Sequence, residues 1–154
     1  MLCGVPTCGK STFASDGVRG IDGFSSFVIL STDNYIERKA LKYGITYNEA
    51  FDKHIYEATK SLNESLKVAI SFDKNIVWDQ TNLTPKVRKK KLNKVPEHYT
   101  KIAVWFDVPL EEAMIRNQKR PGKVIPEHVL KSMHHSFMPP SLDEGFDDII
   151  KAKQ

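Results

Sequence analysis

The sequence predicts an α/β fold in three layers, a parallel sheet covered by helices on both faces. Continuous apolar runs typical of buried strands occur at 27–30, 76–78 and 102–106, and helical patterns separate them. A glycine-containing loop directly follows the apolar residues 1–3, as it does where the first strand of such a sheet turns into a helix. A chain of 154 residues has the size of one domain, so we expect a single domain over residues 1–154.

The first half of the chain holds two predicted strands and one long helix. Residues 1–3 read as a strand end, and three residues are too few for a full first strand, which leaves open whether the natural chain extends upstream of Met1. Apolar residues recur every three or four positions over 51–69, which indicates a long amphipathic helix. Thr46 and Glu49 have the spacing of a capping box at its start, where two side chains satisfy otherwise unpaired N–H groups.

In the second half, prolines mark where helices begin. Thr84 and Pro85 fit the N-cap and first position of a helix, because proline lacks the N–H that this position leaves unpaired. Pro109 and Pro126 each open a further helix, and a last short strand is expected at 149–150.

The composition is that of a globular protein with a modest basic excess. The formal net charge is +4, which permits a polyanionic partner without requiring one. No apolar run approaches ~18 residues, so no membrane partner is expected. The two cysteines, Cys3 and Cys8, cannot form a disulfide framework, which predicts a reducing, intracellular and cytoplasmic location.

Much of the basic excess lies in one short segment, which either contacts nucleic acid or forms a solvated helix face. Its cations are Lys86, Arg88, Lys89, Lys90, Lys91 and Lys94.

The segment from Gly4 to Ser11 reads GxxxxGKS, the complete sequence of a phosphate-binding loop. In such a loop, backbone N–H groups wrap the phosphates of a nucleotide, and the lysine, here Lys10, reaches the β- and γ-phosphates. The Ser11 hydroxyl coordinates Mg²⁺, so the expected fold is the three-layer P-loop NTPase fold. The residues expected to contact the nucleotide are Gly4, Pro6, Thr7, Cys8, Gly9, Lys10, Ser11 and Thr12.

Ligands of a parallel sheet bind beyond the carboxyl ends of its strands, so the polar residues after each strand are candidate site residues. Asp33 is our candidate general base toward an attacking hydroxyl, with capping of the next helix as the alternative. Asp79 either supports Mg²⁺ or makes a structural hydrogen bond. Asp107 is expected to cap a helix, and Asn82 either fixes its loop or touches the substrate.

A basic segment between two predicted helices contains four cations beside proline and glycine, and we expect it to form a mobile lid over about 116–125. Such a lid closes over a triphosphate, stabilises charge on the γ-phosphoryl group and excludes water. Arg116 is spaced to lie one helical turn before Arg120. An ordinary solvated loop is the alternative.

These segments together resemble the polynucleotide 5′-hydroxyl kinase family, in order and over nearly the whole chain. The more specific segments are Asp79-Gln80-Thr81-Asn82, Arg116-Asn117-Gln118-Lys119-Arg120 and residues 140–146, which read PSLDEGF. The resemblance implies an ATP- and Mg²⁺-dependent transfer of the γ-phosphate to a 5′-hydroxyl end of DNA or RNA. The phosphatase half of the bifunctional repair enzymes has no counterpart in the chain.

By motif match, the resemblance also implies the role of each residue. Lys10 and Ser11 would hold the triphosphate and Mg²⁺, and Asp33 would be the general base. Arg120 would contact the transferring phosphate, with Arg116 in support, as further catalytic residues. The substrate-binding residues would be Asp33, Asp79, Gln80 and Asn82, and the metal ligands Ser11 and Asp79.

Two departures from the family bear on the acceptor. In the bacteriophage enzymes an arginine three residues after the base grips the acceptor's phosphate, whereas here that position is Ile36 and the nearest arginine is Arg38. The chain has Gln80 after Asp79, a form that also resembles the phosphate-loop domain of heterogeneous nuclear ribonucleoprotein U. Two alternatives therefore stay open: a kinase of a nucleoside or other small hydroxyl compound, and a non-catalytic, nucleotide-switched nucleic-acid binder.

Overall fold

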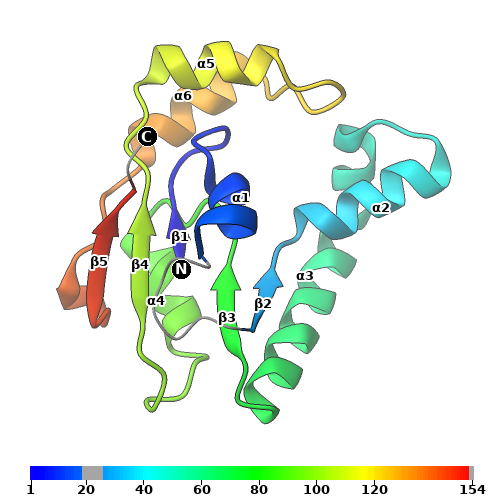
Figure 1. The fold of residues 1–154 in the computed structure, drawn as a ribbon. Helices are drawn as coiled ribbons and strands as arrows, with labels where there is room; N and C mark the ends of the chain where they lie inside the picture. Colours follow the sequence, from blue (N-terminus) through cyan, green and yellow to red (C-terminus); the bar gives the residue numbers. More distant parts are fainter. Residues whose placement is uncertain (19–25, 153–154) are drawn as a thin grey trace.

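Five parallel strands form the sheet of the computed structural model, which describes residues 1–18 and 26–152. The strands are β1 (Leu2–Cys3), β2 (Phe27–Leu30), β3 (Asn75–Trp78), β4 (Ile102–Trp105) and β5 (Asp148–Lys151). Two ladders, β2-β3 and β1-β4-β5, are joined by a parallel bridge between Leu2 and Asp79. The resulting order is β2-β3-β1-β4-β5 (Figure 1), and every pairing is parallel.

Helices lie on both faces of this sheet, which confirms the predicted fold class (Figure 1). α1 (Lys10–Thr12) follows the phosphate loop and continues as a π-helical turn over Phe13–Gly17. The other helices are α2 (Asp33–Tyr43), α3 (Tyr47–Ser71), α4 (Pro85–Leu92), α5 (Leu110–Gln118) and α6 (Glu127–Ser136), and a 3₁₀ turn spans Leu142–Glu144. None of the described helices is long and apolar enough to cross a membrane.

The helix starts follow the capping chemistry of the sequence. Thr46 and Glu49 form the predicted capping box at the start of α3, and the Thr84 side chain caps α4. Pro109 and Pro126 are the N-cap residues of α5 and α6, so these helices begin at the residue after each proline.

Side chains alternate along each strand and divide the core between the two faces of the sheet. On one face, Leu2 and Val104 pack with apolar residues of α5, α6 and the turn after the phosphate loop. On the other face, Trp78 packs with leucines of α3, and Ala103 packs with a leucine of α4. Because packing on both faces fixes the strands, their carboxyl ends form a rigid platform for the loops that follow them.

Candidate active site

The phosphate-binding loop runs from Gly4 to Ser11, between the end of β1 and the first turn of α1 (Figure 1). Gly9 has a φ of 99°, a backbone conformation that strongly favours glycine. At Gly4 the reason is space, because an added Cβ would lie 2.6 Å from Cys8 Sγ. The two fixed glycines of the motif are therefore required by the shape of the loop.

Contacts from α5 hold the tip of this loop. Thr7 has a φ of 69°, which a non-glycine residue adopts only where its surroundings impose it. Thr7 Oγ1 donates to Ala113 O at 3.0 Å, and Arg116 Nη1 donates to Thr7 O at 3.4 Å. Arg116 also forms an ion pair with Glu112 in its own helix. Arg116 therefore contacts the backbone of the phosphate loop.

Lys10 is 8% exposed and folds against the loop's own backbone. Its Nζ donates to Gly4 O at 2.9 Å and to Val5 O at 2.6 Å, and lies 3.4 Å from Cys8 Sγ. The loop thus holds a positive charge among its carbonyl groups. Phosphate oxygens could replace these carbonyls as acceptors, which is the exchange a nucleotide would require.

Ser11 and Asp79 form a pair suited to Mg²⁺. Ser11 Oγ donates to Asp79 Oδ2 at 3.0 Å and so joins the start of α1 to the end of β3. Burial raises the pKa of the Asp79 carboxyl above its ordinary value, and the nearby Asp33 charge raises it further. The hydrogen bond from Ser11 and the Lys10 charge lower this pKa, but burial has the larger effect.

Mg²⁺ takes oxygen ligands and usually keeps places for water and substrate phosphates, so one hydroxyl and one carboxylate fit its requirements. In the described ranges, no cluster of three or more His, Cys, Asp or Glu side chains could hold a metal, so Ser11 and Asp79 stay the candidate ligands.

Asp33 begins α2 and is held from α3. Thr32 is the N-cap residue, so the alternative role of Asp33 as a helix cap is wrong. Asp33 Oδ1 instead accepts a hydrogen bond from Tyr47 Oη at 2.9 Å. Asp33 follows the end of β2 and Asp79 follows the end of β3, and because these two strands pair in parallel, both carboxyl groups lie at the same edge of the sheet. The structure therefore brings together four of the predicted residues: Lys10, Ser11, Asp33 and Asp79.

The segment predicted to be a basic lid, called the lid below, connects α5, which ends at Gln118, to α6, which begins at Glu127. Arg116 therefore lies in a helix and Arg120 in the connection, so the irregular part is shorter than the predicted 116–125. Hydrogen bonds fix the connection at its base: Asn117 Nδ2 donates to Ile125 O at 2.7 Å, and Asn117 Oδ1 accepts from Ile125 N at 3.0 Å.

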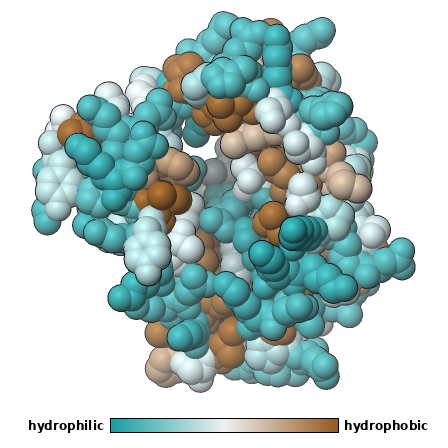
Figure 2. Space-filling view, turned by 180° about the vertical axis from the view of Figure 1, so that it is seen from behind, coloured by the Kyte–Doolittle hydropathy of each residue, from teal (hydrophilic) through white to brown (hydrophobic). Residues whose placement is uncertain are grey.

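At its far end the lid contacts the arm formed by α2 and the start of α3. Lys123 forms an ion pair with Glu37 of α2, and its Nζ lies 4.8 Å from the centroid of the Tyr47 ring. Figure 1 shows this connection reaching from α5 toward the arm. Figure 2, seen from behind, shows the surface hollowed between the arm and the rest of the molecule.

The loop after β3 directs its polar side chains inward. Asn82 is 1% exposed, and its Nδ2 donates to Leu2 O at 2.6 Å and to Gln80 O at 3.1 Å. Gln80 Oε1 accepts from Trp78 Nε1 at 3.0 Å and from Lys91 Nζ at 2.6 Å. Of the two roles considered for Asn82, these contacts favour fixing the loop.

The basic segment is also partly internal. Arg88 is fully buried and forms an ion pair with Glu144 at 2.7 Å. Lys91 points toward Gln80 and Asn82, and burial lowers its pKa to about 8. Four of the six cations are exposed: Lys86, Lys89, Lys90 and Lys94.

Two further positions are settled by packing. Ile36 has no exposed surface and packs with Ala50 and Ala58, so the position that carries an arginine in the bacteriophage enzymes is part of the core here. The prediction that Asp107 caps a helix is wrong, because Pro109 is the N-cap of α5, and Asp107 pairs with Lys151 at 2.8 Å.

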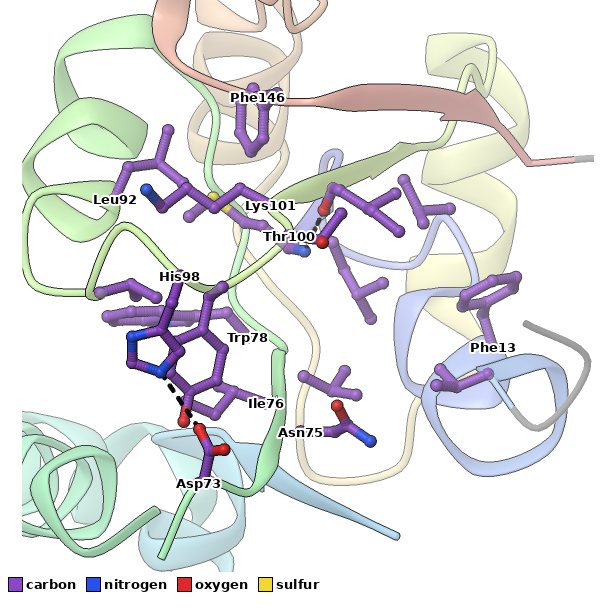
Figure 3. A pocket seen from close by; sticks show the side chains of 18 residues that line it. Phe13, Asp73, Asn75, Ile76, Trp78, Leu92, His98, Thr100, Lys101 and Phe146 are labelled. Atoms are coloured by element: carbon purple, nitrogen blue, oxygen red, sulfur yellow. Dashed lines mark hydrogen bonds and ion pairs between the residues drawn. The ribbon is translucent and has the colours of Figure 1, made fainter. Parts of the chain in front are cut away.

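A cavity of about 490 Å³ is lined by residues outside the phosphate loop. Asp73, Ile76 and Lys101 line it at the amino ends of β3 and β4, whereas the phosphate loop follows the carboxyl end of β1 (Figure 3). His98 and Asp73 approach to 3.1 Å at its polar side. A second pocket of about 400 Å³ lies between α2 and α3 and is lined by the polar side chains of Ser31, Asn34, Arg38, Ser61 and Ser65.

Sequence reasoning missed two residues of the arm, Tyr47 and Glu37, which reach Asp33 and the lid. Lys123 lies within the predicted lid, but its contacts with the arm were not predicted. The capping box already places Tyr47 at the first position of α3, but nothing local indicates that its hydroxyl meets Asp33.

A phosphate loop with its lysine, and a serine after it that is hydrogen-bonded to an aspartate at the end of the adjacent strand, are the features of a P-loop kinase-like domain. The chain belongs to a family described as AAA domain, whose sequence profile matches residues 1–140.

A curated relative is L-seryl-tRNA(Sec) kinase of Methanococcus maripaludis, which is 27% identical over 153 residues. The alignment covers 96% of this chain, and the chain spans about half, 55%, of the relative's length. The relative is thus a distant homologue that is itself a kinase.

Proposed function

We propose that the protein is an ATP- and Mg²⁺-dependent kinase whose acceptor is the 5′-hydroxyl end of DNA or RNA. The observation that carries this proposal is the convergence of Lys10, the Ser11–Asp79 pair and Asp33 at one edge of the sheet. A nucleotide-binding site alone needs no carboxylate free to take a proton, whereas phosphoryl transfer to a hydroxyl does.

In the proposed reaction, the acceptor hydroxyl gives its proton to the Asp33 carboxylate as its oxygen bonds to the γ-phosphorus. The bond from the γ-phosphorus to the β–γ bridging oxygen breaks, and ADP leaves. Lys10 stabilises the charge on the β- and γ-phosphate oxygens, and Arg120 acts on the transferring group from the lid. Ser11 and Asp79 would hold Mg²⁺, which would neutralise part of the negative charge of the phosphates.

The polynucleotide acceptor is supported by the order of the sequence segments, which run from the phosphate loop to residues 140–146. A second candidate is the serine hydroxyl of a seryl-tRNA, favoured by the homology to L-seryl-tRNA(Sec) kinase over 96% of the chain. Both acceptors are hydroxyl groups carried by a polyanion. A binder without catalysis is a weaker candidate, because it would need neither Asp33 nor the pair of Arg116 and Arg120. A nucleoside or other small hydroxyl acceptor fits the loss of the acceptor arginine at Ile36, and a panel of acceptors separates it from the polynucleotide.

The experiment follows labelled γ-phosphate from ATP with Mg²⁺ onto a panel of acceptors: 5′-hydroxyl DNA, 5′-hydroxyl RNA, seryl-tRNA and nucleosides. Wild type is compared with Asp33→Asn and with Asp52→Asn, which removes an exposed carboxylate from α3. We expect label on a 5′-hydroxyl end with wild type and Asp52→Asn, and none with Asp33→Asn despite retained ATP binding.

Label on seryl-tRNA alone would replace the first acceptor by the second. Label on nucleosides alone would make the protein a small-molecule kinase. Absence of transfer to every acceptor, with ATP bound, would leave only the nucleotide-dependent binder.

A further inference from the structure

The candidate base is held by a contact from outside its own helix. Tyr47 Oη donates to Asp33 Oδ1 at 2.9 Å, and the capping box of Thr46 and Glu49 fixes Tyr47 at the start of α3. Burial and the Asp33 charge raise the pKa of the Tyr47 phenol, so this hydroxyl stays protonated and acts as a donor. A carboxylate has two oxygens, and a donor at Oδ1 leaves Oδ2 for an acceptor hydroxyl.

The same tyrosine is in contact with the lid. Lys123 Nζ lies 4.8 Å from the Tyr47 ring centroid, and Lys123 is ion-paired with Glu37, one helical turn beyond Asp33. Burial lowers the pKa of Lys123 and the Asp33 charge partly opposes this, so these two charges lie within electrostatic reach. The Arg120 charge also acts on the phenol. Of the lid cations, Lys123 is thus in contact with the ring of the residue that holds the candidate base.

The tyrosine ring also packs within the arm. Tyr47 packs against the cluster of Ile36, Ala50 and Ala58, and its ring centroid lies 6.2 Å from that of Phe51. The ring position is thus set by the core of the arm, and the lid adds one more contact to it.

We propose that Tyr47 is a positioning residue for Asp33 and that Lys123 couples closure of the lid to this positioning. The inference rests on the proposed kinase function, because it takes Asp33 as the base. When Lys123 contacts both Glu37 and the Tyr47 ring, the lid is closed against the arm, and the Tyr47 hydroxyl holds the Asp33 carboxylate in place. Transfer would then be fastest when the lid excludes water from the site.

The test compares Tyr47→Phe with Tyr56→Phe, because Tyr56 lies on the same helix and is 82% exposed. Tyr47→Phe keeps the ring for Lys123 and removes only the hydroxyl. We expect kcat to fall about tenfold or more, because a misplaced reacting group is costly, while the KM for ATP and the ATP affinity stay unchanged.

Lys123→Met is compared in the same way with Lys119→Met, an exposed lysine of the same connection. We expect a smaller loss of kcat than for Tyr47→Phe. The double variant of Tyr47 and Lys123 should lose less than the product of the two single losses, because both act through one contact. Losses that multiply would overturn the coupling.

Two kinetic results would overturn the role of Tyr47. A Tyr47→Phe protein with the kcat of Tyr56→Phe would show that the hydroxyl does not position the base. A Tyr47→Phe protein with a retained kcat and a lower KM for the acceptor would show that the tyrosine obstructs the acceptor.

Hydrogen exchange of the lid separates this inference from the proposed function. Lys123→Met should accelerate exchange of the amides of residues 119–125 relative to Lys119→Met, whether or not the protein transfers phosphate. If wild type phosphorylates no acceptor, the proposed function fails, and unchanged exchange in Lys123→Met would then also refute the contact between lid and arm.

Discussion

Arg88→Met perturbs the buried contact that joins the loop after β3 to the C-terminal segment. The Arg88 guanidinium donates to both carboxylate oxygens of Glu144, each at 2.7 Å, and to the carbonyl oxygens of Asn82 and Met138, each at 2.9 Å. Methionine keeps an apolar stem but removes the charge and every donor. Glu144, whose side chain is 7% exposed, is then left as an uncompensated buried charge. Breaking a buried ion pair from one side lowers the free energy of unfolding by about 3–5 kcal/mol.

Urea denaturation at pH 7 measures this loss, and a thermal scan should show Tm lower by roughly 6–20 °C, at about 2–4 °C per kcal/mol for a chain of this size. Lys89→Met, an exposed neighbour on α4, is the control and should change stability by no more than about 0.5 kcal/mol. Arg88→Met combined with Glu144→Leu should recover most of the loss, because no unpaired charge is then buried.

The pH dependence gives an independent check. Burial raises the pKa of Glu144, but hydrogen bonds from Arg88 and from the Ser141 N–H, with the Arg88 charge, hold it below its ordinary value of 4.5. A carboxyl with a lowered folded-state pKa stabilises the protein above its unfolded-state pKa, and this contribution is lost as pH falls through the folded-state value.

In Arg88→Met the effect of burial on Glu144 dominates, so protonation on acidification relieves the buried charge. The stability gap between wild type and variant should therefore narrow from pH 7 to pH 4. A cost below about 1 kcal/mol at pH 7, or a gap that does not change with pH, would refute the reasoning.

Three further predictions concern the site and the basic helix. Lys10→Ala should lower kcat/KM for transfer at least about a hundredfold, because it removes a charge aimed at the developing transition state; near-normal turnover in a single-turnover assay would contradict this. Arg120→Ala should lower kcat about tenfold or more at saturating ATP, whereas Lys119→Ala should leave kcat unchanged. Equal kcat values for the two variants would show that Arg120 takes no part in the transfer step. Replacing Lys89 and Lys90 by glutamine should reduce the steepness of log affinity for a 5′-hydroxyl oligonucleotide against log salt concentration by about 1.4–1.8, because two phosphate contacts are lost. An unchanged slope would show that these lysines do not contact the oligonucleotide and only face solvent.

The parts of the fold that the sequence predicts are those with a local signal. The strands follow from continuous apolar runs, and the start of α3 follows from Thr46 and Glu49, which lie three residues apart. The edge of the sheet that carries the phosphate loop follows from the GxxxxGKS motif. The pairing of Ser11 with Asp79 then follows from topology, because adjacent parallel strands bring their carboxyl ends to the same edge.

The parts that sequence reasoning could not supply depend on contacts between distant residues. Arg88 and Lys91 look like members of a basic surface, yet their positions on α4 turn them inward toward Glu144 and Gln80. A helix of eight residues with lysines at four positions has no apolar stripe strong enough to reveal which face is buried. The hydrogen bond from Tyr47 to Asp33 depends in the same way on how α2 and α3 pack, which no local spacing encodes.

Gln80 connects the start of α2 to the basic helix through one amide group. Trp78 Nε1 and Lys91 Nζ both donate to its Oε1, and its Nε2 donates to Thr32 Oγ1 at 3.3 Å. A glutamate could accept the first two hydrogen bonds but could not donate the third, and an apolar residue would leave the half-buried Lys91 ammonium without one of its acceptors. Because Thr32 directly precedes Asp33, the glutamine at this position helps to set how the end of β2, and with it the candidate base, is held against β3.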